Sequence, residues 1–235
     1  MQTSSTYRAL ARTSLQGRWG EGVLAVFVYF LIYCICYAPG YPSLMNAARG
    51  GMAVSWWSES LSGMSAVLLI LVVGPLVYAL QTAFLQLKRG EEDTVLSKTW
   101  DNLRARYTSF LLAGVLTGII IVLVGVVTLG IGAVIFAYAY RMVPYLLHDY
   151  PTLSTKEALK TSREMMKGHK WDLFVLDISF IGWYFLAMLT LGIGVLWVLP
   201  YQYVALSHFY DDLKAEKIVD EDAEGEVEEV QAEEV

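Results

Sequence analysis

The chain has 235 residues, of which 56% are hydrophobic, and its mean hydropathy is +0.47. These values exclude an ordinary soluble domain, which has fewer apolar residues and no long continuous apolar runs. The net charge of −6 arises at one end, because Ala215–Val235 holds ten acidic residues and one lysine, which leaves 16 basic and 13 acidic residues before it. The body is therefore apolar and mildly basic, and we expect no nucleic-acid partner.

The first apolar runs predict a helical hairpin in a membrane. Residues Ser4–Trp19 form a basic, amphipathic segment suited to the membrane interface. A first span is predicted from Gly20 to Ala38 and a second from Met64 to Leu87. Pro75 lies in the middle of the second span and predicts a kink there. The loop between these spans carries Arg49.

Two longer apolar stretches follow. The 42 residues between Arg106 and Asp149 contain one charge, and so do the 38 residues between Asp172 and Asp211. A 42-residue helix would be about 63 Å long, whereas the hydrocarbon core of a bilayer is about 30 Å thick. Each stretch therefore predicts two spans. The four spans are residues 107–127, 133–148, 173–189 and 195–210.

The same pentapeptide, Thr-Leu-Gly-Ile-Gly, stands in the middle of both stretches. It occupies residues 128–132 and again residues 190–194, 62 positions later. Two glycines two residues apart suit a chain that reverses direction between packed helices, so Gly130, Gly132, Gly192 and Gly194 are predicted turn residues. The alternative is a continuous helix with a glycine kink, and the length argument disfavours it in both copies.

The pentapeptides belong to a longer predicted repeat. Asp149 and Asp211 are also 62 residues apart, and Pro75 and Pro200 are 125 apart. Each unit would comprise a basic amphipathic helix, a span, an outer turn and a returning span. The units cover residues 4–93, 94–153 and 154–213, within a membrane domain of residues 1–213, and an acidic tail of residues 214–235 is predicted to be disordered. The third amphipathic helix begins at Ser154, which with Glu157 predicts a capping box.

The predicted fold class is accordingly all-α: a polytopic membrane protein with six transmembrane helices arranged as three repeated helical hairpins, and with short cytoplasmic amphipathic helices. Charge placement predicts its orientation. Of the 17 lysines and arginines, only Arg49 lies in a predicted outer loop and only Arg141 lies inside a span. The positive-inside rule then places both termini in the cytoplasm.

Two charged residues within spans form the candidate polar site. Arg141 stands eight residues before Asp149, about 12 Å along a helix, and Asp177 stands seven after Lys170, about 10 Å. At this similar depth they are predicted to form a buried ion pair, since a lone charge there is costly. Either the pair is structural, or Arg141 extends to the interface, or the two residues form a site for a substrate or ion.

The basic segments before each hairpin are candidates for binding anionic lipid headgroups. Alternatively, they act only as topology signals. The candidate headgroup contacts are Arg12, Arg18, Arg104, Arg106, Lys167 and Lys170. The histidines and cysteines show no metal-ligand spacing, and no catalytic motif is recognisable, so we expect no metal, no cofactor and no enzymatic activity.

Several motifs resemble one known family. The segments Met166–Gly168, Ser179–Trp183 and Thr190–Gly194, followed by Pro200-Tyr201 and Phe209-Tyr210, are similar to the C-terminal signature of the domain of unknown function 975 (DUF975) family. Leu15–Trp19 is similar to its opening. The resemblance covers about Ala9 to Leu213 and implies a multi-pass protein of the bacterial cytoplasmic membrane. It supplies no catalytic residue.

The sequence leaves two functions open. The first is a non-catalytic membrane component that interacts with lipids, or with a protein partner at its cytoplasmic face. The alternative is a small transporter or channel that uses the polar site around Arg141 and Asp177. A water-accessible cavity that reaches these two residues would favour transport.

Overall fold

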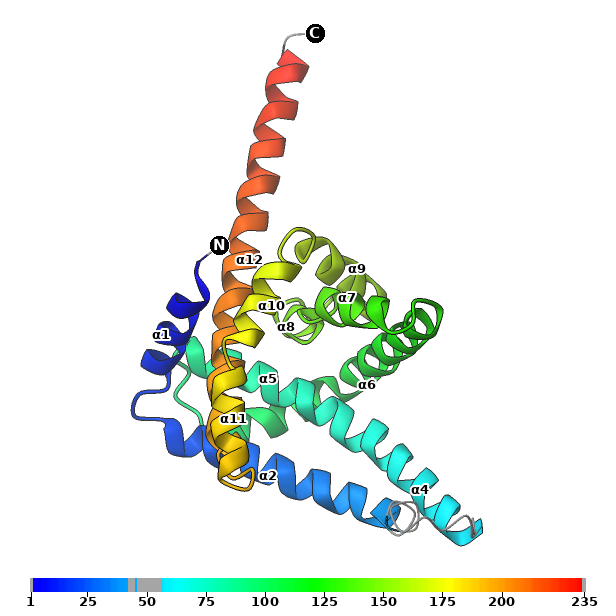
Figure 1. The fold of residues 1–235 in the computed structure, drawn as a ribbon. Helices are drawn as coiled ribbons and strands as arrows, with labels where there is room; N and C mark the ends of the chain where they lie inside the picture. Colours follow the sequence, from blue (N-terminus) through cyan, green and yellow to red (C-terminus); the bar gives the residue numbers. More distant parts are fainter. Residues whose placement is uncertain (1, 42–44, 46–55, 234–235) are drawn as a thin grey trace.

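The computed structural model describes residues 2–41, 45 and 56–233, and of residues 56–59 and 218–233 it describes the backbone alone. The described residues form helices joined by turns (Figure 1), so the predicted all-α class is confirmed. Four helical segments are long and apolar enough to cross a membrane, which indicates a multi-pass membrane protein. They are Trp19–Gly40, Ser60–Lys88, Val95–Val127 and Lys170–Leu189. The predicted outer loop with Arg49 lies outside the described residues.

The first hairpin pairs a regular helix with a helix that contains a π-helical segment. After α1 (Ser4–Ser14), its first arm is α2 (Trp19–Tyr37), which ends in the short η1 (Ala38–Gly40). Its second arm is α4 (Trp56–Leu68), the π-helical η2 (Leu69–Val73) and α5 (Gly74–Lys88). The π-helical segment η2 follows from Pro75, which has no N–H to donate to the carbonyl of Leu71. The hydroxyl of Tyr107, from the next hairpin, donates to that carbonyl instead at 2.8 Å.

The second hairpin begins with α6 (Val95–Val127), which merges the predicted amphipathic helix with the third span and retains a kink at Arg106. The corresponding segments of the other hairpins contain Gly17 and Gly168, whose φ angles of +79° and +95° end the preceding helices. In the second hairpin this position is Ala105. Alanine rarely adopts a positive φ, so the helix continues through it.

The predicted fourth span, residues 133–148, is two short helices rather than one. They are α7 (Ile131–Ala139) and α8 (Val143–Asp149), joined by a turn at residues 140–142. The cause is Pro144, which cannot donate to the carbonyl of Tyr140 and whose ring would clash with it. Arg141 lies in this turn, so the break places a charged residue where the chain leaves the helix.

The third hairpin consists of α9 (Thr155–Met165), α10 (Lys170–Ile178), α11 (Ile181–Leu189) and α12 (Val195–Glu233). The predicted capping box at the start of α9 is confirmed. The fifth span breaks between α10 and α11, where the Ser179 hydroxyl donates to the carbonyl of Leu176 at 2.6 Å and competes with the helical pattern. By contrast, α12 continues through Pro200.

Helix α12 runs from Val195 to Glu233 and so passes through the predicted boundary between Leu213 and Lys214 (Figure 1). Extending an existing helix needs no new nucleus, and the alanines, glutamates and lysines of this segment favour helix formation.

Both pentapeptides reverse the chain with the same backbone geometry. In each copy a leucine and the following glycine have positive φ: 53° and 91° at Leu129 and Gly130, and 55° and 87° at Leu191 and Gly192. In each copy the threonine hydroxyl accepts from the N–H of the second glycine, at 2.8 Å in the first and 2.9 Å in the second. The leucines at the turns are 93% and 95% exposed.

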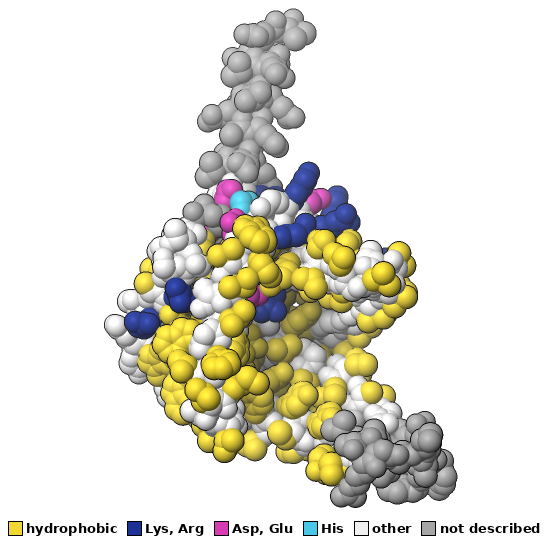
Figure 2. Space-filling model, in the orientation of Figure 1, with side chains coloured by type: hydrophobic (Ala, Val, Ile, Leu, Met, Phe, Trp, Pro, Cys, Tyr) yellow, Lys and Arg dark blue, Asp and Glu magenta, His cyan; other side chains and the backbone are white. Residues whose placement is uncertain are grey.

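The three hairpins meet around α8 and α12 and point in different directions (Figure 1). Fully buried aromatic side chains from α1, α5, α8 and α12 pack there with a larger number of aliphatic side chains to form the core. Away from this centre the hairpins expose apolar side chains, coloured yellow in Figure 2. Gly114 and Gly118 line an apolar groove between α5 and α6, where nothing lies within 4 Å of the position a Cβ would take.

Candidate functional site

The three hairpins are joined, at the ends where their helices converge, by a cluster of charges, which we call the charged clasp: Lys88, Arg89, Asp149, Asp211 and Lys214. Arg89 donates to both oxygens of Asp149, at 2.6 and 2.8 Å, and to Asp211 at 2.9 Å. Lys214 donates to Asp149 at 2.8 Å, and Lys88 pairs with Asp211. The clasp thus connects α5, α8 and α12.

The Asp149 side chain is only 4% exposed, and its charge is compensated by its neighbours. Burial opposes ionisation, but hydrogen bonds from Arg89, His148 and Lys214 outweigh it and hold the pKa of Asp149 well below its ordinary value. For Lys214, burial favours the neutral amine, yet the hydrogen bond to Asp149 raises its pKa above the ordinary value. Both groups are therefore charged at neutral pH.

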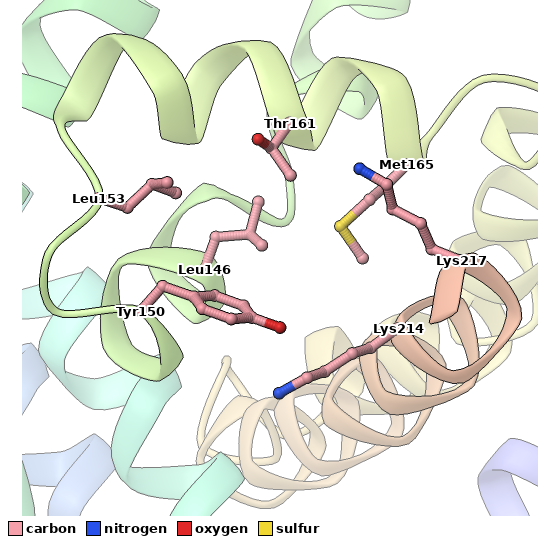
Figure 3. A pocket seen from close by; sticks show the side chains of 7 residues that line it. All are labelled: Leu146, Tyr150, Leu153, Thr161, Met165, Lys214 and Lys217. Carbon is pink, nitrogen blue, oxygen red and sulfur yellow. The ribbon is translucent and has the colours of Figure 1, made fainter. Parts of the chain in front are cut away.

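Beside the clasp, a pocket of about 230 Å³ opens between α8, α9 and α12 (Figure 3). Apolar side chains of Leu146, Leu153 and Met165 line it. The side chains of Lys214 and Lys217 extend along its other side in Figure 3. An apolar wall facing two lysines suits an amphiphile with an anionic headgroup.

Basic residues also gather on the outer side of α9. Lys160, Arg163, Lys167 and Lys170 surround a shallow depression together with one acidic residue, Glu164. Figure 2 shows dark blue side chains gathered in this region. We call these four basic residues the α9 patch. It includes two of the predicted headgroup contacts, Lys167 and Lys170.

The other predicted headgroup contacts do not join this patch. Arg12 on α1 and Arg104 on α6 are exposed, while Arg106 is partly buried at the kink of α6. The Arg18 guanidinium is occupied by hydrogen bonds within the protein rather than presented to a lipid headgroup, because it donates to the carbonyls of Glu91 and Asp93, at 2.6 and 2.7 Å. It also pairs with Glu21. Arg18 thus anchors the loop after α5.

The second candidate site lies where the broken helices face one another. Within the part of the chain that the structure describes, no ion pair joins Arg141 to Asp177. Asp177 instead accepts from the Gln202 side-chain amide at 2.9 Å, and Gln202 accepts from the Tyr184 hydroxyl. In place of the predicted ion pair, Asp177 accepts from a neutral donor, the Gln202 amide, which is itself hydrogen-bonded to Tyr184. The break at residues 140–142 explains this difference, because depth counted along an unbroken helix does not apply to Arg141.

Gln202 is the residue that the sequence hypothesis missed. The signal was present, since Gln202 is a polar amide in an apolar span, two residues after Pro200. None of the four cavities described for this structure is lined by Arg141 or Asp177. The two charges nevertheless share neighbours, because both act electrostatically on Tyr138 and Tyr184.

Comparison with known proteins places part of the chain in the range of a family model. Residues 108–217 match the model of a family described as protein of unknown function (DUF975). The match begins at the start of the third predicted span and covers the last two hairpins. Leu15–Trp19, which resembles the family's opening, lies outside it. No curated protein and no solved structure matches the chain.

Proposed function

We propose that this protein, whose residues 108–217 match the DUF975 family, is a non-catalytic component of the bacterial cytoplasmic membrane. In this proposal it binds anionic lipids at its inner face. The observation that carries the proposal is the pocket between α8, α9 and α12, in which an apolar wall faces Lys217 and the Asp149-bound Lys214. The neighbouring α9 patch supplies further positive charge.

The proposed topology has six crossings in three repeated hairpins, with both termini in the cytoplasm. The two identical turns support it, as does the near absence of positive charge from the outer side. The broken fourth span remains a crossing in this scheme because α8 is buried in protein, where an interrupted helix is tolerated. The acidic tail could dock a basic protein partner at the same inner face.

Cysteine labelling tests the topology. Single cysteines replace Leu129 or Leu191 in a chain whose Cys34 and Cys36 are changed to alanine. Both leucines are more than 90% exposed, so their replacements should react readily. We expect an impermeant maleimide to label both from outside intact cells. Because the two turns point in different directions in Figure 1, each is judged separately. Labelling from the cytoplasmic side alone would refute the topology for that hairpin.

Lipid binding is tested on the full-length protein in detergent. Native mass spectrometry would measure the occupancy of added phosphatidylglycerol on the wild type, on Lys217→Gln and on the double change Lys167→Gln with Lys170→Gln. Each basic residue near an anionic surface contributes about 1 kcal/mol, so a single change should weaken binding about fivefold and the double change more.

Lys156→Gln is the matched control, because Lys156 is an exposed lysine of α9 that lines neither the pocket nor the patch. It should bind phosphatidylglycerol nearly as well as the wild type. If Lys156→Gln weakened binding as much as Lys217→Gln does, the attraction would be general and the pocket would have no special role.

A small transporter is the second candidate, and one observation favours it. Both α7–α8 and α10–α11 are interrupted helices, and interrupted helices often carry substrate sites in transporters. Reconstituted vesicles that accumulated a labelled anion, and lost this uptake on Arg141→Gln, would support transport over a purely lipid-binding role.

A further inference from the structure

Arg141 is a cation without a counter-ion inside the apolar part of the protein. It lies in the turn between α7 and α8, and it is partly buried. Among the described residues its guanidinium forms neither a hydrogen bond nor an ion pair, and its Nε atom is enclosed without a partner. A guanidinium has five N–H donors, so this one has unused capacity for an anion.

The groups near Arg141 are mostly hydroxyl donors rather than carboxylates. Five tyrosines from five different helices lie within its electrostatic range: Tyr78, Tyr138, Tyr145, Tyr184 and Tyr203. Tyr145 is the most informative, since it is fully buried and its hydroxyl has the Ser207 side chain nearby but forms no well-directed hydrogen bond. A buried hydroxyl that lacks a well-directed partner is costly, and this one lies within the electrostatic range of a cation that has no hydrogen bond among the described residues.

The nearby carboxylate does not neutralise this charge. Asp177 is held by Gln202 at 2.9 Å, and Gln202 is held in turn by Tyr184. Asp177 lies within electrostatic range of two of these tyrosines, Tyr138 and Tyr184, but it forms no ion pair with Arg141 among the described residues. Removing a charge from water without a close partner is expensive, so a further anion would lower the energy of this arrangement.

We propose that Arg141 and Tyr145 bind an anionic group, a carboxylate or a phosphate ester, between the interrupted helices. The guanidinium supplies charge-assisted donors, and the Tyr145 hydroxyl supplies one more. Pro144 interrupts the helix beside Arg141, which therefore lies in a turn between α7 and α8. The inference concerns binding alone and does not depend on transport or on the pocket between α8, α9 and α12.

The test measures thermal stability of the full-length protein in nanodiscs. Wild type and Arg141→Gln are compared in phosphatidylcholine alone, with inorganic phosphate or succinate added, and with phosphatidylglycerol in the bilayer. We expect at least one anion to raise the melting temperature of the wild type in a saturable manner, and Arg141→Gln to weaken that effect about tenfold or more, as expected for a lost charged hydrogen bond. A response to phosphate or succinate identifies a soluble ligand, and a response to phosphatidylglycerol alone identifies a lipid.

Without an anion, Arg141→Gln should melt no lower than the wild type, because it removes a charge that has no partner. Should Arg141→Gln fail to fold, Tyr145→Phe provides the second variant, since it keeps the ring and removes only the hydroxyl. Lys156→Gln is the control for general charge, because Lys156 is exposed and lines neither the pocket nor the α9 patch, and it should respond to the anion as the wild type does. The proposal is overturned if no anion stabilises the wild type, or if the Arg141 and Lys156 variants respond alike.

Discussion

Asp149 is the most buried charge of the charged clasp, so its removal should have the largest effect there. Its carboxylate is 4% exposed and accepts from Arg89, Lys214 and Tyr210. Asp149→Asn keeps the shape but removes the charge, leaving two cations without their shared partner. Breaking a buried pair in this way costs about 3–5 kcal/mol. For a chain of this size, 1 kcal/mol lowers the melting temperature by about 2–4 °C, so we expect a decrease of about 6–20 °C.

The assay is thermal unfolding in detergent, followed by the fluorescence of the tryptophans. Asp211→Asn is the matched control. The Asp211 side chain is 27% exposed, so water can solvate its cationic partners, Lys88 and Arg89, when the carboxylate charge is removed. Its melting temperature should fall by less than half as much. Combining Asp149→Asn with Lys214→Gln should cost less than the sum of the two changes, since both disrupt one interaction. Equal decreases for the two aspartates, or strict additivity, would refute the reasoning.

Three further predictions follow from the geometry. Gly130→Ala, at a φ of +91°, should cost about 1–2 kcal/mol in an unfolding titration, whereas Gly114→Ala, whose added Cβ meets nothing within 4 Å, should be neutral or slightly stabilising. Tyr107→Phe should cost about 1–3 kcal/mol, because the carbonyl of Leu71 loses its donor. The pKa of Asp149 is lowered in the folded protein, so the ionised carboxylate stabilises the fold fully above its unfolded pKa of about 3.9, and this stabilisation is lost as the pH falls through the folded pKa. The melting temperature of the wild type should therefore fall more steeply below about pH 4 than that of Asp149→Asn.

The reversals of the chain were predictable because they depend on local sequence and on length. A nearly uncharged stretch that is too long for one membrane crossing must reverse direction, and the glycine pair in each pentapeptide indicates where the chain turns. The start of α9 was predictable for a similar reason, since Ser154 and Glu157 satisfy each other's backbone groups within a single turn.

The candidate site was less predictable because it depends on where a helix stops. The sequence predicted an ion pair from the depth of Arg141 along an unbroken span, and Pro144 interrupts that span at Tyr140. A mid-span proline can kink a helix or end it, and the surrounding packing decides which. Pro200 shows the other outcome, because α12 continues through it. The partner of Asp177 was missed for a related reason, since Gln202 approaches it from another helix.

The hydroxyl of Tyr107 on the carbonyl of Leu71 has a consequence for the order of assembly. Chains are made from the N terminus onward, so the earlier hairpin is synthesised while Pro75 leaves one of its backbone acceptors bare. That acceptor is poorly tolerated in hydrocarbon until α6 arrives. Tyr107 of α6 thus supplies the donor that the first hairpin lacks. We therefore expect the first and second hairpins to reach their final packing together rather than one after the other.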